Sequence, residues 1–169
     1  RAENIKSPIT IELPTKTKRK TFTKVDNLLY TLENNNVVLY EPNQKPKIAF
    51  YDIEKSNKNT PGLFITKKGT LFVYDKHLIK YYNKKQRKKL ASFDTQISKI
   101  VSNDVAIYIS LKNSGLVHYD IKTKKITDYR KNRMLSRFLP TNATSLFLDK
   151  TTLWAGSNES GLYEIDIEN

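Results

Sequence analysis

The sequence has no cysteine, one tryptophan, two histidines and only five glycines in 169 residues. Because cysteine is absent, thiol catalysis, thiolate metal sites and disulfide frameworks are excluded together. The glycines form neither a Gly-x-Gly-x-x-Gly or Walker phosphate loop nor a Gly-x-Ser-x-Gly nucleophile elbow. Several common catalytic and nucleotide-binding chemistries are therefore excluded at the outset.

The other side chains that could carry chemistry also lack a catalytic arrangement. His77 and His118 stand at no metal-ligand spacing from each other or from a carboxylate. Carboxylates such as Glu159 and Glu164 have no sequence reason to face each other. We therefore expect a protein that is not an enzyme and that carries no metal or other cofactor.

Long apolar segments are missing as well. No apolar run approaches the roughly 18 residues of a membrane-spanning helix, and the first residues, Arg1 to Asn4, lack the apolar core of a signal peptide. The sequence therefore indicates either a cytosolic protein or a mature or excised piece. A chain of this length can bury roughly 70% of the surface that its unfolded form exposes, so a single domain is stable without a disulfide or a structural metal.

Positive charge is abundant: 30 lysines and arginines against 17 acidic residues give a net charge of +13. Such a balance is typical of proteins that bind nucleic acid or another polyanion. A composition rich in lysine and asparagine also follows from an A/T-biased genome, so the sum alone decides nothing. The position of the charge in the fold has to be found first.

Four segments of the chain repeat one pattern of short strands and tight polar breaks. The third strand of each segment ends at an equivalent position: Tyr40, Tyr81, Tyr119 and Ile165. These positions recur about every 40 residues, which is the period of a four-stranded propeller blade. Residues 105–110 alternate with a period of two rather than 3.6. The pattern predicts an all-β fold of propeller-type blades, each with four antiparallel strands.

The strands of each blade are expected at the following residues, in chain order. The first blade, at about 21–51, has strands at 21–25, 28–32, 37–40 and 47–51. The second, at 63–93, has them at 63–66, 70–74, 78–82 and 89–93. The third, at 97–129, has them at 97–101, 105–110, 116–119 and 126–129. The fourth, at 145–166, has only three, at 145–148, 152–155 and 162–165.

The ends of the repeat array leave two arrangements open. Residues 9–13 form an additional alternating strand between Pro8 and Pro14. This strand could supply the missing outer strand of the fourth blade and close a small ring, which would remove open sheet edges. Alternatively, it ends a preceding blade, and residues 1–169 are a fragment of a larger propeller. A non-propeller antiparallel β fold is a third, weaker reading.

The last repeat carries a more specific motif. Residues 139–149 read Leu-Pro-Thr-Asn-Ala-Thr-Ser-Leu-Phe-Leu-Asp, followed by Leu-Trp-Ala-Gly-Ser at 153–157 and Gly-Leu-Tyr at 161–163. This pattern resembles the two-component regulator propeller repeat, from which Phe138, Ser157 and Ser160 depart. In such a blade Trp154 would wedge between neighbouring blades, and Gly156 and Gly161 would permit a short turn.

The resemblance implies a sensing role. Such propellers most often form the periplasmic sensor region of bacterial hybrid two-component regulators, where they detect oligosaccharides released from glycans. The implied location is the periplasm or cell envelope, although the residues themselves leave the cytoplasm open. The implied partners are an oligosaccharide or anionic glycan and further blades or a signalling module in the same polypeptide, with a homodimer as a further option.

The basic residues gather in the connections between the third and fourth strands of the blades. Because successive strands alternate in direction, these connections are expected on one face of the blade stack. That basic face would attract a polyanion, or its lysines would simply blunt edge pairing. Specific nucleic-acid binding is not expected, because aromatic residues do not interleave with the basic ones. The basic residues are Lys45, Lys47, Lys84, Lys85, Arg87, Lys88, Lys89, Lys122, Lys124 and Lys125.

The opposite face is where propeller ligands more often bind. It is built from the turns between second and third strands and from the links between blades, including an insertion at 130–142 in which 131–139 is expected to form a turn of helix. The candidate ligand-binding residues are His77, Asn113, Asn158, Arg130, Lys131, Arg133 and Arg137.

These observations support three hypotheses. The leading one is a non-catalytic sensor or ligand-binding propeller that detects a glycan or oligosaccharide. The second is a structural protein-interaction propeller of a cell-surface or secretion assembly. The third is a polyanion-binding module that uses the basic face.

Overall fold

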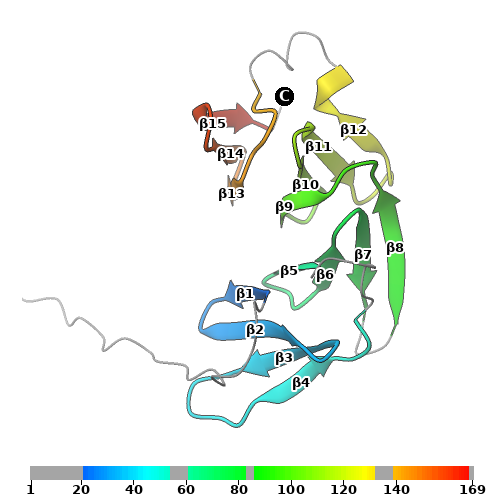
Figure 1. Ribbon diagram of the computed structural model, residues 1–169, viewed down its shortest axis with the longest axis vertical. Coiled ribbons are helices and arrows are strands. Elements are labelled where there is room, and N and C mark those ends of the chain that lie inside the picture. Colours follow the sequence, from blue (N-terminus) through cyan, green and yellow to red (C-terminus); the bar gives the residue numbers. More distant parts are fainter. Residues whose placement is uncertain (1–20, 54–60, 83–85, 132–138, 168–169) are drawn as a thin grey trace, which may run out of the picture.

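The computed structural model describes residues 21–53, 61–82, 86–131 and 139–167. These residues form three four-stranded antiparallel sheets and one three-stranded sheet, and each sheet keeps the strand order of the sequence. Figure 1 shows the sheets following one another around an open arc. The first strands of neighbouring sheets contact each other along its inner side. The expected all-β architecture of propeller-type blades is confirmed.

The strand bounds are as follows. The first blade contains β1 (Phe22–Val25), β2 (Leu28–Glu33), β3 (Asn36–Tyr40) and β4 (Lys47–Phe50). The second contains β5 (Gly62–Ile65), β6 (Leu71–Tyr74), β7 (His77–Tyr81) and β8 (Arg87–Ser92). The third contains β9 (Ile97–Ser102), β10 (Ala106–Leu111), β11 (Gly115–Asp120) and β12 (Ile126–Asp128), and the short 3-10 helix η1 (Tyr129–Lys131) follows. The fourth contains β13 (Ser145–Asp149), β14 (Thr152–Ser157) and β15 (Gly161–Asp166).

Residues that tolerate a left-handed backbone form the reversals between strands. Asn34 and Asn35, between β2 and β3, have φ angles of 47° and 66°. Asparagine accepts this region more readily than most residues, and a positive φ at both central positions is typical of tight hairpin turns. Gly115 and Gly161, with φ angles of 76° and 86°, begin β11 and β15. The polar breaks in the sequence thus correspond to the strand reversals.

The apolar core lies between successive blades. Leu71 belongs to the cluster between the first and second blades, and Ile107 to the cluster between the second and third. A third cluster, around Leu116 and Leu153, joins the third blade to the fourth. All six residues of β10 are buried, because the third blade packs against a neighbour on both faces. Packing between blades therefore holds the arc together.

The fourth blade buries only one of its faces among the described residues. Leu153 and Ala155 face the third blade, so the alternation of the strand directs Trp154 to the other side, beside its register partner Phe147. Phe147 and Leu162 are 63% and 69% exposed there. The expected wedge of Trp154 between two blades is therefore not formed within the described part of the chain.

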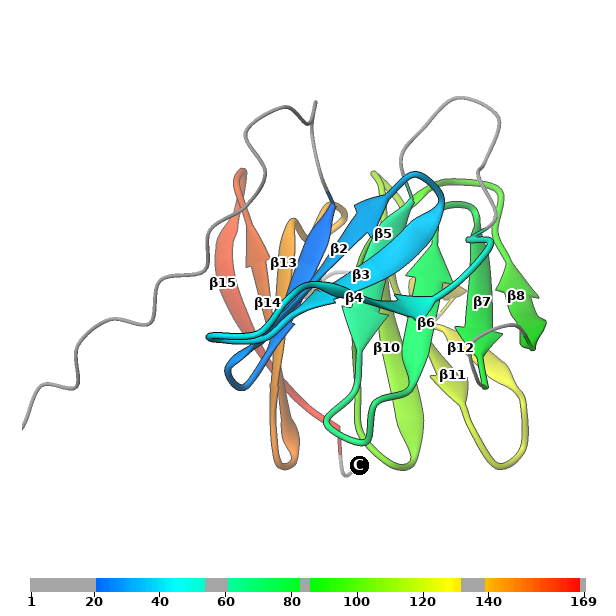
Figure 2. The same ribbon diagram turned by 90° about the horizontal axis from the view of Figure 1, so that it is seen from below.

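The described blades do not close into a ring. Figure 1 shows the first and fourth blades as the two separate ends of the arc, and Figure 2, seen from below, places the first blade in front of the fourth. The small closed ring is thus not what these residues form. Residues 9–13, which were expected to add the missing strand, lie outside the described residues. Residues 132–138, most of the expected helical turn, do so as well.

The basic segment at 87–89 lies differently from expectation. Strand β8 begins at Arg87, so these residues belong to the outer strand of the second blade and not to a connection. Side chains alternate along a strand, so Lys88 faces the third blade and Arg87 faces the first. Nη1 of Arg87 donates to the carbonyl oxygen of Asp52, in the segment after the first blade, at 2.9 Å. Solvated lysines are well tolerated on an edge strand. This charge therefore lies on the outer strand of the second blade and not in the connection where it was expected.

Candidate functional site

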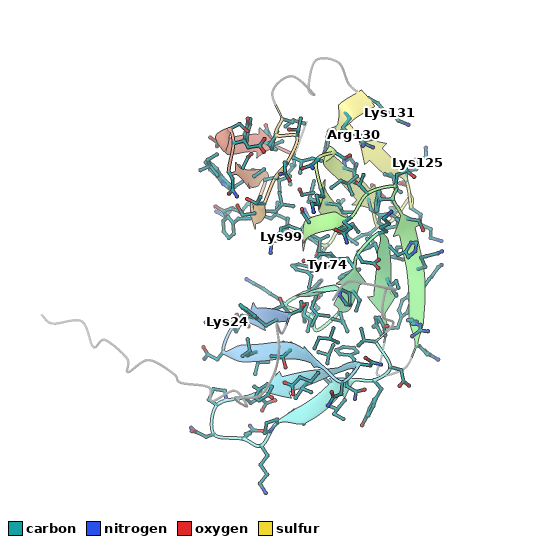
Figure 3. All side chains as sticks on the ribbon, in the orientation of Figure 1. Lys24, Tyr74, Lys99, Lys125, Arg130 and Lys131 are labelled. Carbon is teal, nitrogen blue, oxygen red and sulfur yellow. The ribbon has the colours of Figure 1, made fainter. Side chains whose placement is uncertain are left out.

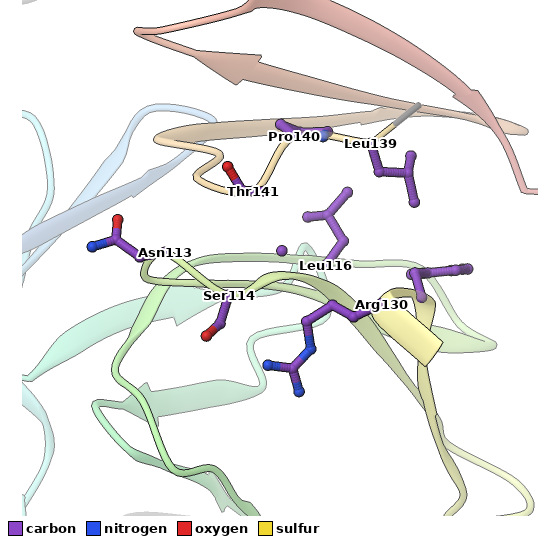
Figure 4. Close-up of a pocket in the computed structure, with 9 residues that line it drawn as sticks. Asn113, Ser114, Leu116, Arg130, Leu139, Pro140 and Thr141 are labelled. Atoms are coloured by element: carbon purple, nitrogen blue, oxygen red, sulfur yellow. The ribbon is translucent and has the colours of Figure 1, made fainter. Parts of the chain in front are cut away.

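A cavity of about 360 Å³ lies between the third blade and the segment 139–141 that leads into the fourth blade. We call it the interblade pocket. Figure 4 shows Leu116 and Leu139 on opposite sides of it, with Asn113 and Thr141 at one end. It is lined by Asn113, Ser114, Gly115, Leu116, Tyr129, Arg130, Leu139, Pro140 and Thr141.

Two hydrogen bonds fix the segment before β13 against the third blade. The backbone N–H of Gly115 donates to the carbonyl oxygen of Thr141 at 2.7 Å. The hydroxyl of Ser110, which is fully buried, donates from Oγ to the carbonyl oxygen of Ala143 at 2.6 Å. Both bonds run from the third blade to residues 141–143, so they hold the two walls of the interblade pocket at a defined separation.

Gly115 leaves little room for a side chain. A Cβ atom built there would lie 3.1 Å from Cγ of Arg130 and 3.8 Å from the carbonyl oxygen of Pro140. Its φ of 76° also lies in the region that disfavours residues with a Cβ. The close approach of Arg130 to the pocket wall therefore depends on this glycine.

An ion pair orients Arg130. Its Nε donates to Oδ1 of Asp128 at 2.8 Å and its Nη2 donates to Oδ2 at 2.5 Å. The backbone N–H of Arg130 donates to Oδ1 as well, at 3.0 Å. The bonds from Arg130 hold the pKa of the Asp128 carboxyl below its usual range. The guanidinium is thus a fixed planar donor whose charge Asp128 largely balances, so it suits a neutral polar ligand.

An aromatic group continues the pocket wall. The Tyr129 hydroxyl lies 2.8 Å from Nδ1 of His118, and the centroids of the two rings are 5.4 Å apart. Tyr108 lies on the other side of His118, with centroids 6.0 Å apart. Burial raises the pKa of Tyr129 to about 12. Burial lowers the pKa of His118, and the charge of Asp120 partly opposes this shift. Both rings are therefore neutral near pH 7.

The chemistry of the described site suits binding. Its floor is apolar, and its polar groups are an amide, hydroxyls and a guanidinium. Within the described residues no group of three histidine, cysteine or acidic side chains could hold a metal ion. The described part of the chain also has no helix that is long and apolar enough to cross a membrane.

The structure separates the expected ligand-binding residues. Asn113 and Arg130 line the interblade pocket, and Lys131 follows Arg130 in η1, where Figure 3 labels both. Asn158 accepts a bond from the Thr144 hydroxyl at 3.3 Å in the fourth blade. His77 begins β7 in the second blade, with its Nδ1 3.0 Å from Oγ of Ser92. Neither His77 nor Asn158 lines the pocket. Arg133 and Arg137 lie outside the described residues.

Several pocket residues were not named individually as ligand-binding candidates, although residues 139–141 lie in the insertion expected on the ligand-binding face. Leu139, Pro140 and Thr141 were identified as a repeat motif and interpreted as structural. Tyr129 was expected to end a strand, and Leu116 to begin one. The motif itself was the signal that could have pointed to the site, because it begins inside the insertion that holds the candidate ligand-binding residues.

The remaining residues of the expected basic face are only partly described. Lys122, Lys124 and Lys125 lie exposed in the connection between β11 and β12. Lys47 forms an ion pair of 2.6 Å with Glu41 in the first blade, and Lys45 is exposed nearby. Lys84 and Lys85 lie outside the described residues.

Comparison with known proteins supports the fold. No protein-family model matches the chain, and no curated protein matches it. Among solved structures, a streptogramin B lyase is similar, with a TM-score of 0.53 and 11% identity over 88% of this chain and 54% of that chain. The extracellular domain of the one-component system BT4673 of B. thetaiotaomicron gives a TM-score of 0.38 and 12% identity over 92% of this chain and 34% of that one. The chain spans about half the length of the first structure and a third of the second. At these identities the lyase shows the fold alone.

Proposed function

We propose that this chain is a non-catalytic sensor or ligand-binding propeller whose interblade pocket binds a sugar ring of an oligosaccharide. The observation that carries the proposal is the pairing of an apolar floor with a polar rim. Leu139 and Tyr129 are the partly exposed apolar residues of the pocket lining, backed by the buried Leu116 and Pro140, and Asn113 and Thr141 contribute to the rim. A sugar ring has an apolar C–H face and an edge of hydroxyl groups, so it can satisfy both parts.

Size and charge support the same ligand class. A cavity of about 360 Å³ lies near the lower end of the range for small-molecule sites, so it suits one or two rings better than a polymer. Because Asp128 balances the charge of Arg130, the lining does not strongly favour anions. The ligand hydroxyls would meet backbone and side-chain groups at the rim.

The motif resemblance supports a sensor in a bacterial cell envelope, within a hybrid two-component regulator. Leu139, Pro140 and Thr141 belong to that motif and also line the interblade pocket. A ligand there would contact the third blade and the segment that leads into the fourth. Its binding would therefore change the free energy of the interblade contact, which is a direct way to report occupancy to a neighbouring module.

The test is titration calorimetry with a panel of neutral and acidic oligosaccharides. Thr141→Val removes a hydroxyl and keeps the side-chain volume. Asn113→Gly removes an amide and keeps the left-handed backbone, since Asn113 has a φ of 54°. Each is expected to weaken binding about five- to tenfold, the effect of one lost hydrogen bond. Lys76→Gln, an exposed change in the second blade, is the matched control.

Two results would contradict this proposal. One is the absence of saccharide binding across the panel. The other is equal affinity of Thr141→Val, Asn113→Gly and Lys76→Gln. Chromatography of the saccharide after long incubation with the protein tests whether the protein is non-catalytic, and new saccharide products would contradict this.

A structural protein-interaction propeller is the second candidate, favoured by the outer face of the fourth blade. Phe147 and Leu162 are strongly exposed there beside Trp154. Equivalent faces of the preceding blades pack against a neighbour, so this face suits a further blade or a partner protein. This candidate predicts a stable protein complex together with an absence of saccharide binding.

A further inference from the structure

Four exposed apolar side chains lie around the connection between β11 and β12. Tyr82, Val105, Ile121 and Ile126 are 56%, 63%, 38% and 45% exposed. Single exposed apolar residues are common on soluble proteins. A group of them within a basic region requires a more specific explanation.

Several contacts join these residues into one surface. The backbone N–H of Ile121 donates to the carbonyl oxygen of Val105 at 2.9 Å. Ile126 on β12 is the register partner of Tyr119 on β11. Burial raises the pKa of Tyr119, and the nearby Tyr82 phenol adds to the rise. Tyr119 packs in the core between the second and third blades, so its register partner Ile126 faces the second blade. Tyr81 packs toward the first blade, so the next residue, Tyr82, is directed toward the third.

Lysines surround the four apolar residues. Nζ of Lys80 lies 4.9 Å from the centroid of the Tyr82 ring, and Lys88 is the register partner of Lys80 on β8. Asp120 accepts the backbone N–H of Thr123 at 2.6 Å and so stabilises the turn that presents the other lysines. Figure 3 places Lys125 at the outer rim of the third blade. The docking surface consists of Tyr82, Val105, Ile121, Ile126, Lys80, Lys88, Lys122, Lys124 and Lys125.

We propose that the docking surface binds the headgroup region of a membrane that contains anionic lipids. Lysines near such a membrane are attracted by its negative surface potential. Apolar side chains between them can enter the boundary between headgroups and acyl chains, where tyrosine is also well accommodated. The two kinds of residue act together, since neither the charge nor the apolar area is large enough alone.

A soluble polyanion fits the docking surface less well. Binding to a polyanion would use the lysines and leave Val105, Ile121 and Ile126 without a role. Bidentate recognition of sulfate or carboxylate groups is typical of arginine, whereas the cations of this surface are lysines. The proposal is independent of the interblade pocket, which lies between the third blade and the segment that leads into the fourth.

The test is co-sedimentation with vesicles of phosphatidylcholine, with and without added phosphatidylglycerol. The protein is expected to bind only the anionic vesicles. The partition coefficient is expected to fall about a hundredfold in the triple variant Lys122→Gln, Lys124→Gln and Lys125→Gln, because each lysine contributes about fivefold. The matched control removes the same charge elsewhere, with Lys76→Gln, Lys99→Gln and Lys112→Gln.

The apolar residues provide the decisive comparison. Val105→Ser and Ile121→Ser together are expected to lower vesicle binding several-fold and to leave retention on heparin resin unchanged. Unchanged vesicle binding by this variant would overturn the proposal and indicate plain polyanion adsorption. An equal loss in the matched lysine control would also overturn it. Circular dichroism melting curves check that every variant remains folded.

Discussion

At the scale of single residues, the interblade pocket depends on Gly115. Gly115→Ala is expected to destabilise the fold by about 1–2 kcal/mol for the left-handed backbone alone. The new Cβ, 3.1 Å from Cγ of Arg130, adds a contact that Arg130 must relieve by moving. Urea denaturation measures the loss. Gly69→Ala is the matched control, because Gly69 has a similar φ of 77° and nothing within 4 Å of its added Cβ. Equal losses in the two variants would contradict the close packing at Gly115.

His118 gives the fold a pH dependence that can be measured. Burial lowers the pKa of His118 in the folded chain, while the unfolded chain keeps the ordinary value near 6.5. As the pH falls through about 6.5, the unfolded chain takes up the proton first, so stability is complete above this pH and declines below it. Unfolding midpoints measured between about pH 7 and pH 5.5 should fall, and His118→Gln should reduce the slope. An unchanged slope in that variant would rule out His118 as the cause.

At the scale of elements, Ser110 of β10 connects the third blade to the segment before β13. Ser110→Ala leaves the buried carbonyl oxygen of Ala143 without this donor, and it is expected to cost about 1–3 kcal/mol. Ser92→Ala, an exposed change on β8, is the control and should have little effect. Chemical denaturation distinguishes the two variants. A neutral Ser110→Ala would show that this bond does not hold the two blades together.

The elements also show what the sequence could predict. Alternating apolar residues predicted the strands of the blades, because the same alternation marks a strand and the face of it that is buried. The start of β8 was missed because Arg87, Lys88 and Lys89 read as a polar connection. On an edge strand solvent accepts such residues on both faces, so hydropathy does not mark the boundary. The sequence did not predict the interblade pocket and named only Asn113 and Arg130 of its lining as candidates, because the contact of Gly115 with Thr141 joins distant segments.

At the scale of the whole molecule, an arc of blades has two end faces. The repeated packing between blades leaves Phe147 and Leu162 exposed on the fourth blade. Phe147→Ser with Leu162→Ser is expected to reduce binding of a dye that fluoresces on apolar surfaces, without lowering the unfolding midpoint. Ile48→Ser, at a residue that is only 37% exposed, is the control. A clear fall in the midpoint of the double variant would mean that this face is already packed against another segment.

The central claim is that the interblade pocket binds a sugar ring of an oligosaccharide. Amide chemical shifts recorded by NMR during titration with the tightest saccharide of the panel test it most directly. The largest shifts are expected at Ser114, Gly115, Leu116 and Thr141, which line the pocket. Shifts confined to other blades, or none at saturating saccharide, would contradict the claim.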